Sequence, residues 1–72
     1  MSNRIVDYHI ERLKNKSAEV RLKSINELRL IGDAAALEPL EQLFRHDPEP
    51  EVRQAAQTAG LEIFMKNRKK DT

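Results

Sequence analysis

Apolar residues recur along the chain at the three- and four-residue spacing of amphipathic helices, and this pattern divides it into four segments. Each segment carries one apolar stripe that we expect to face inward. The predicted inward residues are Ile5, Val6, Ile10 and Leu13 in the first segment; Val20, Ser24, Leu28 and Ile31, with Ile25 at the edge, in the second; Leu37, Leu40, Leu43 and Phe44 in the third; and Val52, Ala56, Ala59, Ile63 and Phe64 in the fourth.

Capping residues set the limits of the first two helices. Ser2 or Asn3 can cap the first and Ser17 the second, because short polar side chains accept hydrogen bonds from the free amides at a helix start. The second helix then covers about residues 18–31 and stops at Gly32, which can adopt the left-handed conformation of a helix C-terminus.

Proline marks the third helix and the loop after it. Asp33 caps this helix, which is predicted over about residues 34–45. Pro39 lies inside it and removes one backbone donor, which predicts a kink. Two further prolines end the third helix. A fourth helix begins at about Glu51 and is expected to fray from Lys66 onward.

An internal repeat decides how the helices are arranged. The pair Val20-Arg21 recurs as Val52-Arg53, thirty-two residues later, each time after a glutamate and at the start of a helix. A helical hairpin repeated at this spacing cannot bury its apolar face alone and stacks on its neighbour. The sequence therefore predicts an all-α fold, a short α-solenoid of two stacked antiparallel helical hairpins with four helices.

Four short motifs follow one another in the chain: Val20-Arg21, Ile31-Gly32-Asp33, the stretch 36–40 with its proline, and Asp47-Pro48. This order resembles the HEAT repeat family, in its bacterial and archaeal, phycobilisome lyase-type variety. Residues 18–60 match that pattern closely, and residues 3–17 match loosely as a preceding first helix. The resemblance is specific for the fold but says little about function, since one fold serves many purposes.

The resemblance also implies residues that stabilise the stack. In the family, a loop aspartate and the arginine six positions later form a ladder between neighbouring repeats. Asp47 and Arg53 fit that spacing, whereas Asn15 precedes Arg21, which implies a weaker and uncharged rung there. We favour a structural role over ligand binding for these arginines. The full structural set is Arg21, Gly32, Asp33, Pro39, Asp47 and Arg53.

With 72 residues and no cysteine, the chain is expected to form one small domain without disulfides or thiolate metal sites. We assign residues 1–66 to this domain and residues 67–72 to a basic C-terminal tail. No apolar run approaches the ~20 residues that span a bilayer, and no signal-peptide pattern follows Met1. A soluble, cytoplasmic protein that makes no membrane contact is expected.

Charge is distributed unevenly, although the net charge is only +1. Residues 1–32 carry +3, residues 33–51 carry −5 and residues 52–72 carry +3. An acidic centre between basic ends suits the electrostatic selection of a partner. The alternative, which is the more common case, is a set of well-solvated surfaces.

The chain offers little for catalysis. His9 and His46 have no serine or cysteine at an instructive distance, and a metal site needs three or four converging ligands. His46 suits the C-terminal end of its own helix, and Glu49 and Glu51 suit the N-terminal end of the next. We therefore predict no enzyme activity, no metal, no cofactor and no small-molecule substrate.

Nucleic-acid binding is an alternative function, because residues 66–70 place four positive charges in five positions. Only a handful of phosphate contacts could follow. No aromatic platform accompanies these charges, since Tyr8, Phe44 and Phe64 are the whole aromatic set. A solubilising helix end is the favoured interpretation of the basic tail.

Several residues on the second and fourth helices lie away from the inferred core faces. Leu61 and Met65, for example, form an i, i+4 pair on the side opposite Val52 and Ile63. The alternative, of equal weight, is that a wide apolar face packs the four helices together. The predicted partner-binding residues are Leu22, Arg29, Leu30, Gln54, Leu61 and Met65.

The predicted function is a protein–protein interaction module that serves as an adaptor, assembly factor or small regulatory subunit. Its partner is another protein or a second copy of the chain, because the small residues Ala55, Ala56, Ala59 and Gly60 permit the close approach of a helix. The lyase-type resemblance implies an alternative, an accessory subunit in phycobilin attachment or detachment. That role requires a further subunit, since this short chain lacks the surface to enclose a tetrapyrrole.

Overall fold

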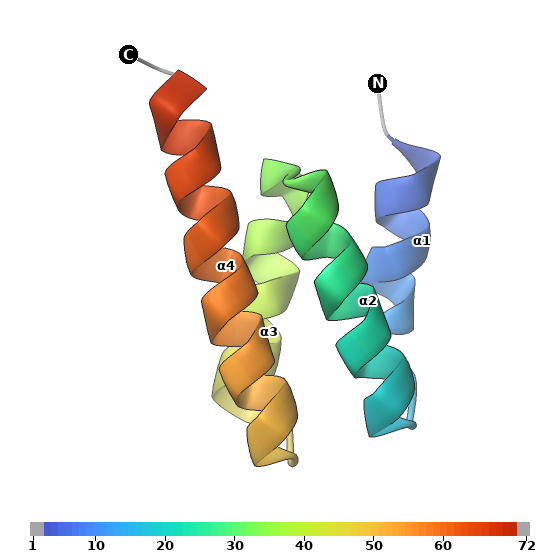
Figure 1. Cartoon of the computed structure of the whole chain (residues 1–72). Helices are drawn as coiled ribbons and strands as arrows, with labels where there is room; N and C mark the ends of the chain where they lie inside the picture. The colour runs from blue at the N-terminus through green and yellow to red at the C-terminus, as the bar shows by residue number, and fades with distance from the viewer. Residues whose placement is uncertain (1–2, 71–72) are drawn as a thin grey trace.

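The computed structural model describes the backbone of residues 3–70 and the side chains of residues 3–68. This part of the chain contains helices and no strand, so the predicted all-α class is confirmed (Figure 1). In chain order the elements are α1 (Arg4–Arg12), α2 (Ala18–Ile31), the short 3-10 helix η1 (Ala34–Ala36), α3 (Leu37–His46) and α4 (Pro50–Lys70).

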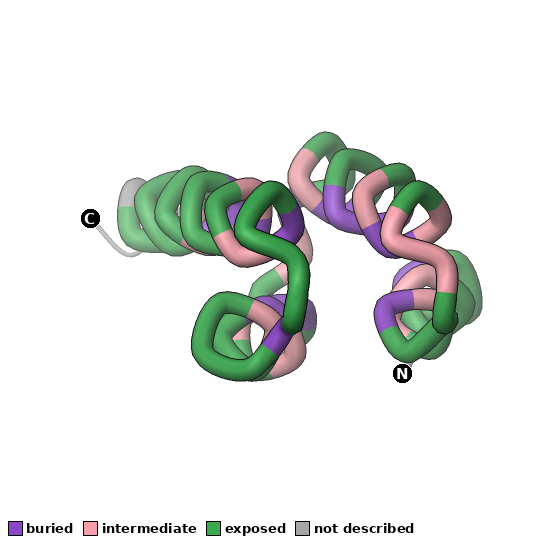
Figure 2. The backbone as a smooth tube through the Cα atoms, turned by 90° about the horizontal axis from the view of Figure 1, so that it is seen from below, coloured by how far each residue is buried: buried purple, intermediate pink, exposed green. Residues whose placement is uncertain are grey.

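The helices form two antiparallel hairpins, α1 with α2 and α3 with α4 (Figure 1). α2 and α4 lie side by side in one layer, whereas α1 and α3 form the other layer and stand further apart (Figure 2). The second hairpin therefore stacks on the first mainly through α2 and α4. The predicted short α-solenoid of two stacked hairpins is confirmed.

Polar side chains start the first two helices. Asn3 Oδ1 accepts hydrogen bonds from the backbone N–H groups of Ile5 and Val6 at 3.0 and 3.3 Å. Ser17 Oγ accepts one from the N–H of Val20 at 3.4 Å. Asn3 and Ser17 therefore cap α1 and α2, and the other predicted cap, Ser2, lies outside the described residues.

The turn between the hairpins combines a left-handed glycine with a polar cap. Gly32 has a φ of 77°, and its N–H donates to the carbonyl of Leu28 at 2.9 Å, which ends α2. Asp33 Oδ1 then accepts a hydrogen bond from the N–H of Ala35 at 2.8 Å. Asp33 thus caps η1, the element that leads into α3.

The third helix differs from the prediction at its start. The chain enters through η1, and α3 itself begins only at Leu37. Pro39 is therefore in the first turn of α3, where backbone N–H groups have no acceptor inside the helix. The proline removes no helical hydrogen bond, so the expected kink has no cause.

The fourth helix is longer than predicted. It begins at Pro50, because proline at the first helical position has a suitable φ and its missing donor costs nothing there. It continues to Lys70 without the fraying expected from Lys66 onward. The predicted boundary between domain and tail, after residue 66, falls inside this helix. Residues 71–72 lie outside the description.

A hydrogen-bonded contact holds the far end of α4 against the first hairpin. Asn67 Nδ2 donates to the carbonyl oxygen of Gly32 at 3.0 Å and to that of Ile63 at 2.8 Å. The Gly32 carbonyl belongs to the C-terminus of α2, where free carbonyl groups need donors. This contact gives a physical reason for the continuation of α4 beyond residue 66.

The core runs through the interface between the hairpins and between the helices of each hairpin. Every helix contributes to it, and η1 does so through Ala36. Its buried hydrophobic residues are Val6, Leu13, Ile25, Leu28, Ala36, Leu40, Val52, Ala56, Ala59 and Ile63.

Four residues predicted to face inward are exposed instead: Ile5, Ile31, Phe44 and Phe64. Successive helical residues point about 100° apart, so a neighbour on the same helix can occupy the inward position. Val6 does so on α1, and the inner stripe of α2 turns toward Ile25. The two phenylalanines lie in a groove on the second hairpin's own surface, outside the core.

An ion pair between Arg21 of α2 and Asp47 of the α3–α4 loop joins the two hairpins. Arg21 Nη2 donates to Asp47 Oδ1 at 3.0 Å, and Arg21 Nε lies 2.7 Å from Oδ2. Both side chains are almost completely buried. Arg21 Nη1 also donates to the carbonyl oxygen of Asn15 at 2.8 Å. One guanidinium group therefore binds the loops of both hairpins.

The predicted ladder is wrong in its pairing. Arg53 does not pair with the Asp47 carboxylate but donates through Nη1 to the Asp47 carbonyl oxygen at 2.7 Å. The arginine six positions after the loop residue thus binds that residue's carbonyl, while the carboxylate reaches back to the arginine of the preceding repeat. The rung at Arg21, predicted to be weak and uncharged, is the charged and buried one.

Removing the charge of Asp47 tests this rung. Asp47→Asn preserves the size of the side chain but leaves the buried guanidinium of Arg21 without a counterion. We expect the free energy of unfolding to fall by about 3 kcal/mol. Urea denaturation followed by circular dichroism measures the change.

The matched control is Glu41→Gln, which breaks the Glu41–Arg45 pair. Both of these side chains are more than half exposed. The control should therefore change the free energy of unfolding by less than about 0.5 kcal/mol. Similar losses in the two variants would show that the Arg21–Asp47 pair does not join the hairpins.

The two glycines of the chain should respond to alanine with opposite signs. At Gly32 the φ of 77° disfavours a side chain, and an added Cβ would lie 2.8 Å from Lys66 Cδ, so Gly32→Ala should lower the free energy of unfolding by about 1–2 kcal/mol. At Gly60, within α4, an added Cβ meets no atom within 4 Å. Gly60→Ala should raise the free energy of unfolding by about 0.5–1 kcal/mol. The same urea titration measures both, and changes of equal sign would contradict these assignments.

Candidate partner-binding surface

The side chains of α2 and α4 line a groove between these two helices, which lie side by side in one layer (Figure 2). We call it the inner groove. Leu22, Arg29 and Gln54, three of the predicted contact residues, line it. Its complete lining is Leu22, Ile25, Asn26 and Arg29 of α2, with Glu51, Gln54, Ala55, Thr58 and Glu62 of α4.

A second hollow adjoins the inner groove toward the C-terminal end of α4. Arg29 and Glu62 line both, and Leu61, Met65 and Lys66 complete the second. Leu61 is 60% exposed and Met65 52% exposed, one helical turn apart. The structure therefore places an exposed apolar pair directly beside charged groups.

Arg29 forms a polar bridge from α2 to α4. Its Nη2 donates to Asn26 Oδ1 at 2.7 Å, and its Nη1 lies 3.4 Å from Glu62 Oε1. The pair with Glu62 is partly exposed and contributes little to stability in water. These contacts place the guanidinium at the junction of the two hollows.

Leu30 lies apart from the other predicted contact residues. Its side chain is 58% exposed on α2 but lines neither the inner groove nor the adjoining hollow. Leu22, Arg29, Gln54, Leu61 and Met65 are thus brought onto one side of the molecule, and Leu30 is not among them. A solitary exposed leucine is common on protein surfaces and carries no argument for binding.

The polar lining of the inner groove is not among the predicted contact residues. Asn26, Glu51, Thr58 and Glu62 belong to it but interrupt no apolar stripe. A usable signal was present, because Thr58 and Glu62 follow Gln54 at successive four-residue steps and so share its face. Apolar periodicity alone does not reveal such a row.

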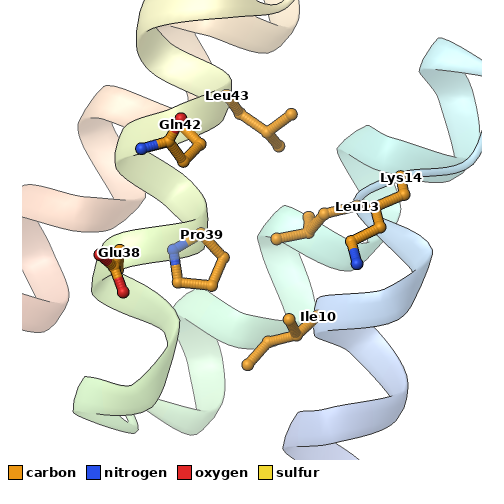
Figure 3. A pocket seen from close by; sticks show the side chains of 7 residues that line it. All are labelled: Ile10, Leu13, Lys14, Glu38, Pro39, Gln42 and Leu43. Atoms are coloured by element: carbon orange, nitrogen blue, oxygen red, sulfur yellow. The ribbon is translucent and has the colours of Figure 1, made fainter.

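A separate groove lies between α1 and α3 in the opposite layer (Figure 3). Ile10 of α1 and Leu13, the residue that follows this helix, face Pro39 and Leu43 of α3 across it. Lys14, Glu38 and Gln42 complete its lining. It follows from the wider spacing of α1 and α3, and none of the predicted partner-binding residues lines it.

The described residues give no support for other kinds of site. Among them, no group of three or more histidine, aspartate or glutamate side chains could hold a metal ion. His9 lies on α1 and His46 at the end of α3, so the two belong to different hairpins. Within the same part of the chain, none of the helices has the length and apolar character needed to cross a membrane.

Comparison with known proteins agrees with this architecture. Residues 2–60 match the family model of HEAT repeats, a span that covers the first hairpin, η1, α3 and about half of α4. No curated protein and no solved structure matched the chain. The match does not distinguish the phycobilisome lyase-type variety, which stays a prediction. Since the match covers most of its length, the chain belongs to the HEAT repeat family.

Proposed function

We propose that the chain is a protein–protein interaction module that binds its partner along the inner groove and the adjoining hollow. HEAT repeats are generally protein-interaction modules. The observation that carries the proposal is the pair Leu61 and Met65, two exposed apolar side chains one turn apart beside the Arg29–Glu62 ion pair. Such an apolar centre with a polar rim is typical of protein interfaces.

The apolar pair can supply a large share of the binding energy. Complete burial of a leucine or methionine side chain contributes about 1.5–3 kcal/mol. Polar groups around such anchors contribute less affinity but select the partner and its orientation. Arg29 and Gln54 are placed for this second role, because both line the groove next to the anchors.

The charges of the surface indicate the chemistry of the partner segment. Glu51 and Glu62 line the inner groove with Arg29, and Lys66 joins them at the hollow. A complementary segment carries apolar side chains flanked by charges of both signs. We assign no catalytic step to the chain, and a role as adaptor, assembly factor or small regulatory subunit suits such a surface.

Charged substitution of the anchors tests the proposal. The double variant Leu61→Asp with Met65→Asp puts two carboxylates where the partner buries apolar surface. We expect partners captured by the wild-type chain, identified by mass spectrometry, to bind the variant at least about tenfold more weakly. Both side chains are exposed, so the melting curve in circular dichroism should change little.

The matched control is Leu30→Asp, which introduces the same charge at an exposed leucine outside both hollows. This variant should retain every partner. Met65→Asp alone should weaken binding as well, because Met65 is one of the two apolar anchors and lines the hollow beside the inner groove. If all captured partners bind the double variant and the wild type equally, the proposed surface is wrong.

A further inference from the structure

The internal repeat gives each residue of α2 a counterpart on α4, thirty-two positions later. On α2, one stripe of residues faces the second hairpin, and the corresponding stripe on α4 points along the stack away from the first. The stripes are Arg21, Ile25, Leu28 and Gly32 on α2 and Arg53, Gln57, Gly60 and Phe64 on α4. We call the second set the end stripe.

The α2 stripe shows what covers such a surface. At one end Arg21 binds the carboxylate of Asp47, and at the other the Gly32 carbonyl accepts from Asn67, both contacts to the second hairpin. Ile25 and Leu28 are buried between these ends. A helical hairpin with an acidic loop is therefore the structure that fits a stripe headed by arginine.

Arg53 makes the same carbonyl contact as Arg21 but, among the described residues, lacks the contacts that Arg21 makes with a carboxylate. Its Nη1 donates to the Asp47 carbonyl at 2.7 Å, as Arg21 Nη1 does to the Asn15 carbonyl at 2.8 Å. Arg21 uses its Nη2 and Nε for a carboxylate. Within residues 3–68, the same two nitrogens of Arg53 meet no acceptor. This half of the guanidinium suits a bidentate carboxylate.

The rest of the end stripe borders an apolar hollow of about 350 Å³. Phe44 is 40% exposed and Phe64 50% exposed, and Leu61 lines the hollow with them. At Gly60 an added Cβ would meet nothing within 4 Å, so a helix can approach the backbone closely. Leu37, Glu41, Ala56 and Gln57 complete the lining.

The opposite end of the stack has different chemistry. On the far side of the first hairpin, Arg12 Nε donates to Ser24 Oγ at 3.1 Å and Arg12 Nη1 to the Tyr8 hydroxyl at 2.9 Å. A second copy stacked head to tail would bring this polar end, with its own cation, onto the apolar hollow. Its first loop carries Asn15 in place of an aspartate, so it has no carboxylate for Arg53.

We propose that the end stripe binds a helical hairpin of another protein whose interhelical loop carries a carboxylate. That carboxylate takes the free half of the Arg53 guanidinium, while apolar side chains of the hairpin cover Phe44, Leu61 and Phe64. This surface is separate from the inner groove, and it meets the adjoining hollow only at Leu61, which lines both hollows. The proposal therefore adds a second interaction site to the proposed function.

The experiment adds a synthetic hairpin to the full-length chain. The probe is a peptide of residues 33–70, since this hairpin seats on the equivalent stripe of α2 and carries Asp47 in its loop. Nitrogen-15 NMR of the chain follows the Arg53 Nε–H and the Gly60 amide. We expect saturable shifts at both, together with Phe64, and no change at Gln54, which lines the inner groove.

Two matched changes test the chemistry. The same peptide with Asp47→Asn should bind at least about tenfold more weakly, because it offers the guanidinium a neutral amide. Phe64→Asp in the chain should weaken binding of the unchanged peptide. Phe64 is exposed, so the fold should be preserved, which circular dichroism checks.

Four results would overturn the proposal. The first is equal affinity for the two peptides, and the second is no binding at about millimolar peptide that circular dichroism shows to be helical. The third is a set of shifts centred on Arg21 through exchange with the chain's own second hairpin. The fourth is a dimer in sedimentation that Phe64→Asp dissociates. The last would mean that a second copy covers the stripe. None of these results depends on Met65, so the two proposals can fail separately. A negative result at the end stripe does not contradict binding along the inner groove. A negative result with the Met65 variants does not contradict binding at the end stripe.

Discussion

The Arg21 guanidinium lies between the loops of both hairpins, with the Asn15 carbonyl on one side and the Asp47 carboxylate on the other. A chain of this size buries a modest apolar surface, so specific polar contacts matter more than in a larger domain. Removing either partner while the hairpins stay packed would leave the other as a buried charge without its counterion, which is strongly unfavourable. The relative position of α2 and α4, and therefore the inner groove, depends on this pair.

A second clamp acts at the other end of the same interface, where Asn67 binds the Gly32 carbonyl. The two contacts lie near opposite ends of α2 and hold α4 beside it along its length. A groove fixed at both ends needs little rearrangement to receive a partner. Binding then loses less conformational entropy than it would on a flexible surface.

The periodicity of apolar residues was sufficient to predict the four helices and their stacking from the sequence, because every hairpin must bury an apolar face. It failed at Phe44 and Phe64, since a helix in a stacked repeat has two apolar faces, one toward its own hairpin and one toward the next. A single stripe assigned both to the core. The Asp47 pairing was wrong for another reason: the family resemblance implied Arg53, six positions later, whereas the partner in the structure, Arg21, lies twenty-six residues earlier in the chain.

The contrast between the two ends of the stack has a consequence for assembly. Identical subunits that join head to tail without closing a ring grow into open filaments. One end is closed by hydrogen bonds among Tyr8, Arg12 and Ser24. The other end exposes Phe44 and Phe64 beside Arg53, whose guanidinium, within the described residues, binds only the Asp47 carbonyl. The two ends of the described stack therefore differ in chemistry, which disfavours the head-to-tail growth of identical copies into an open filament.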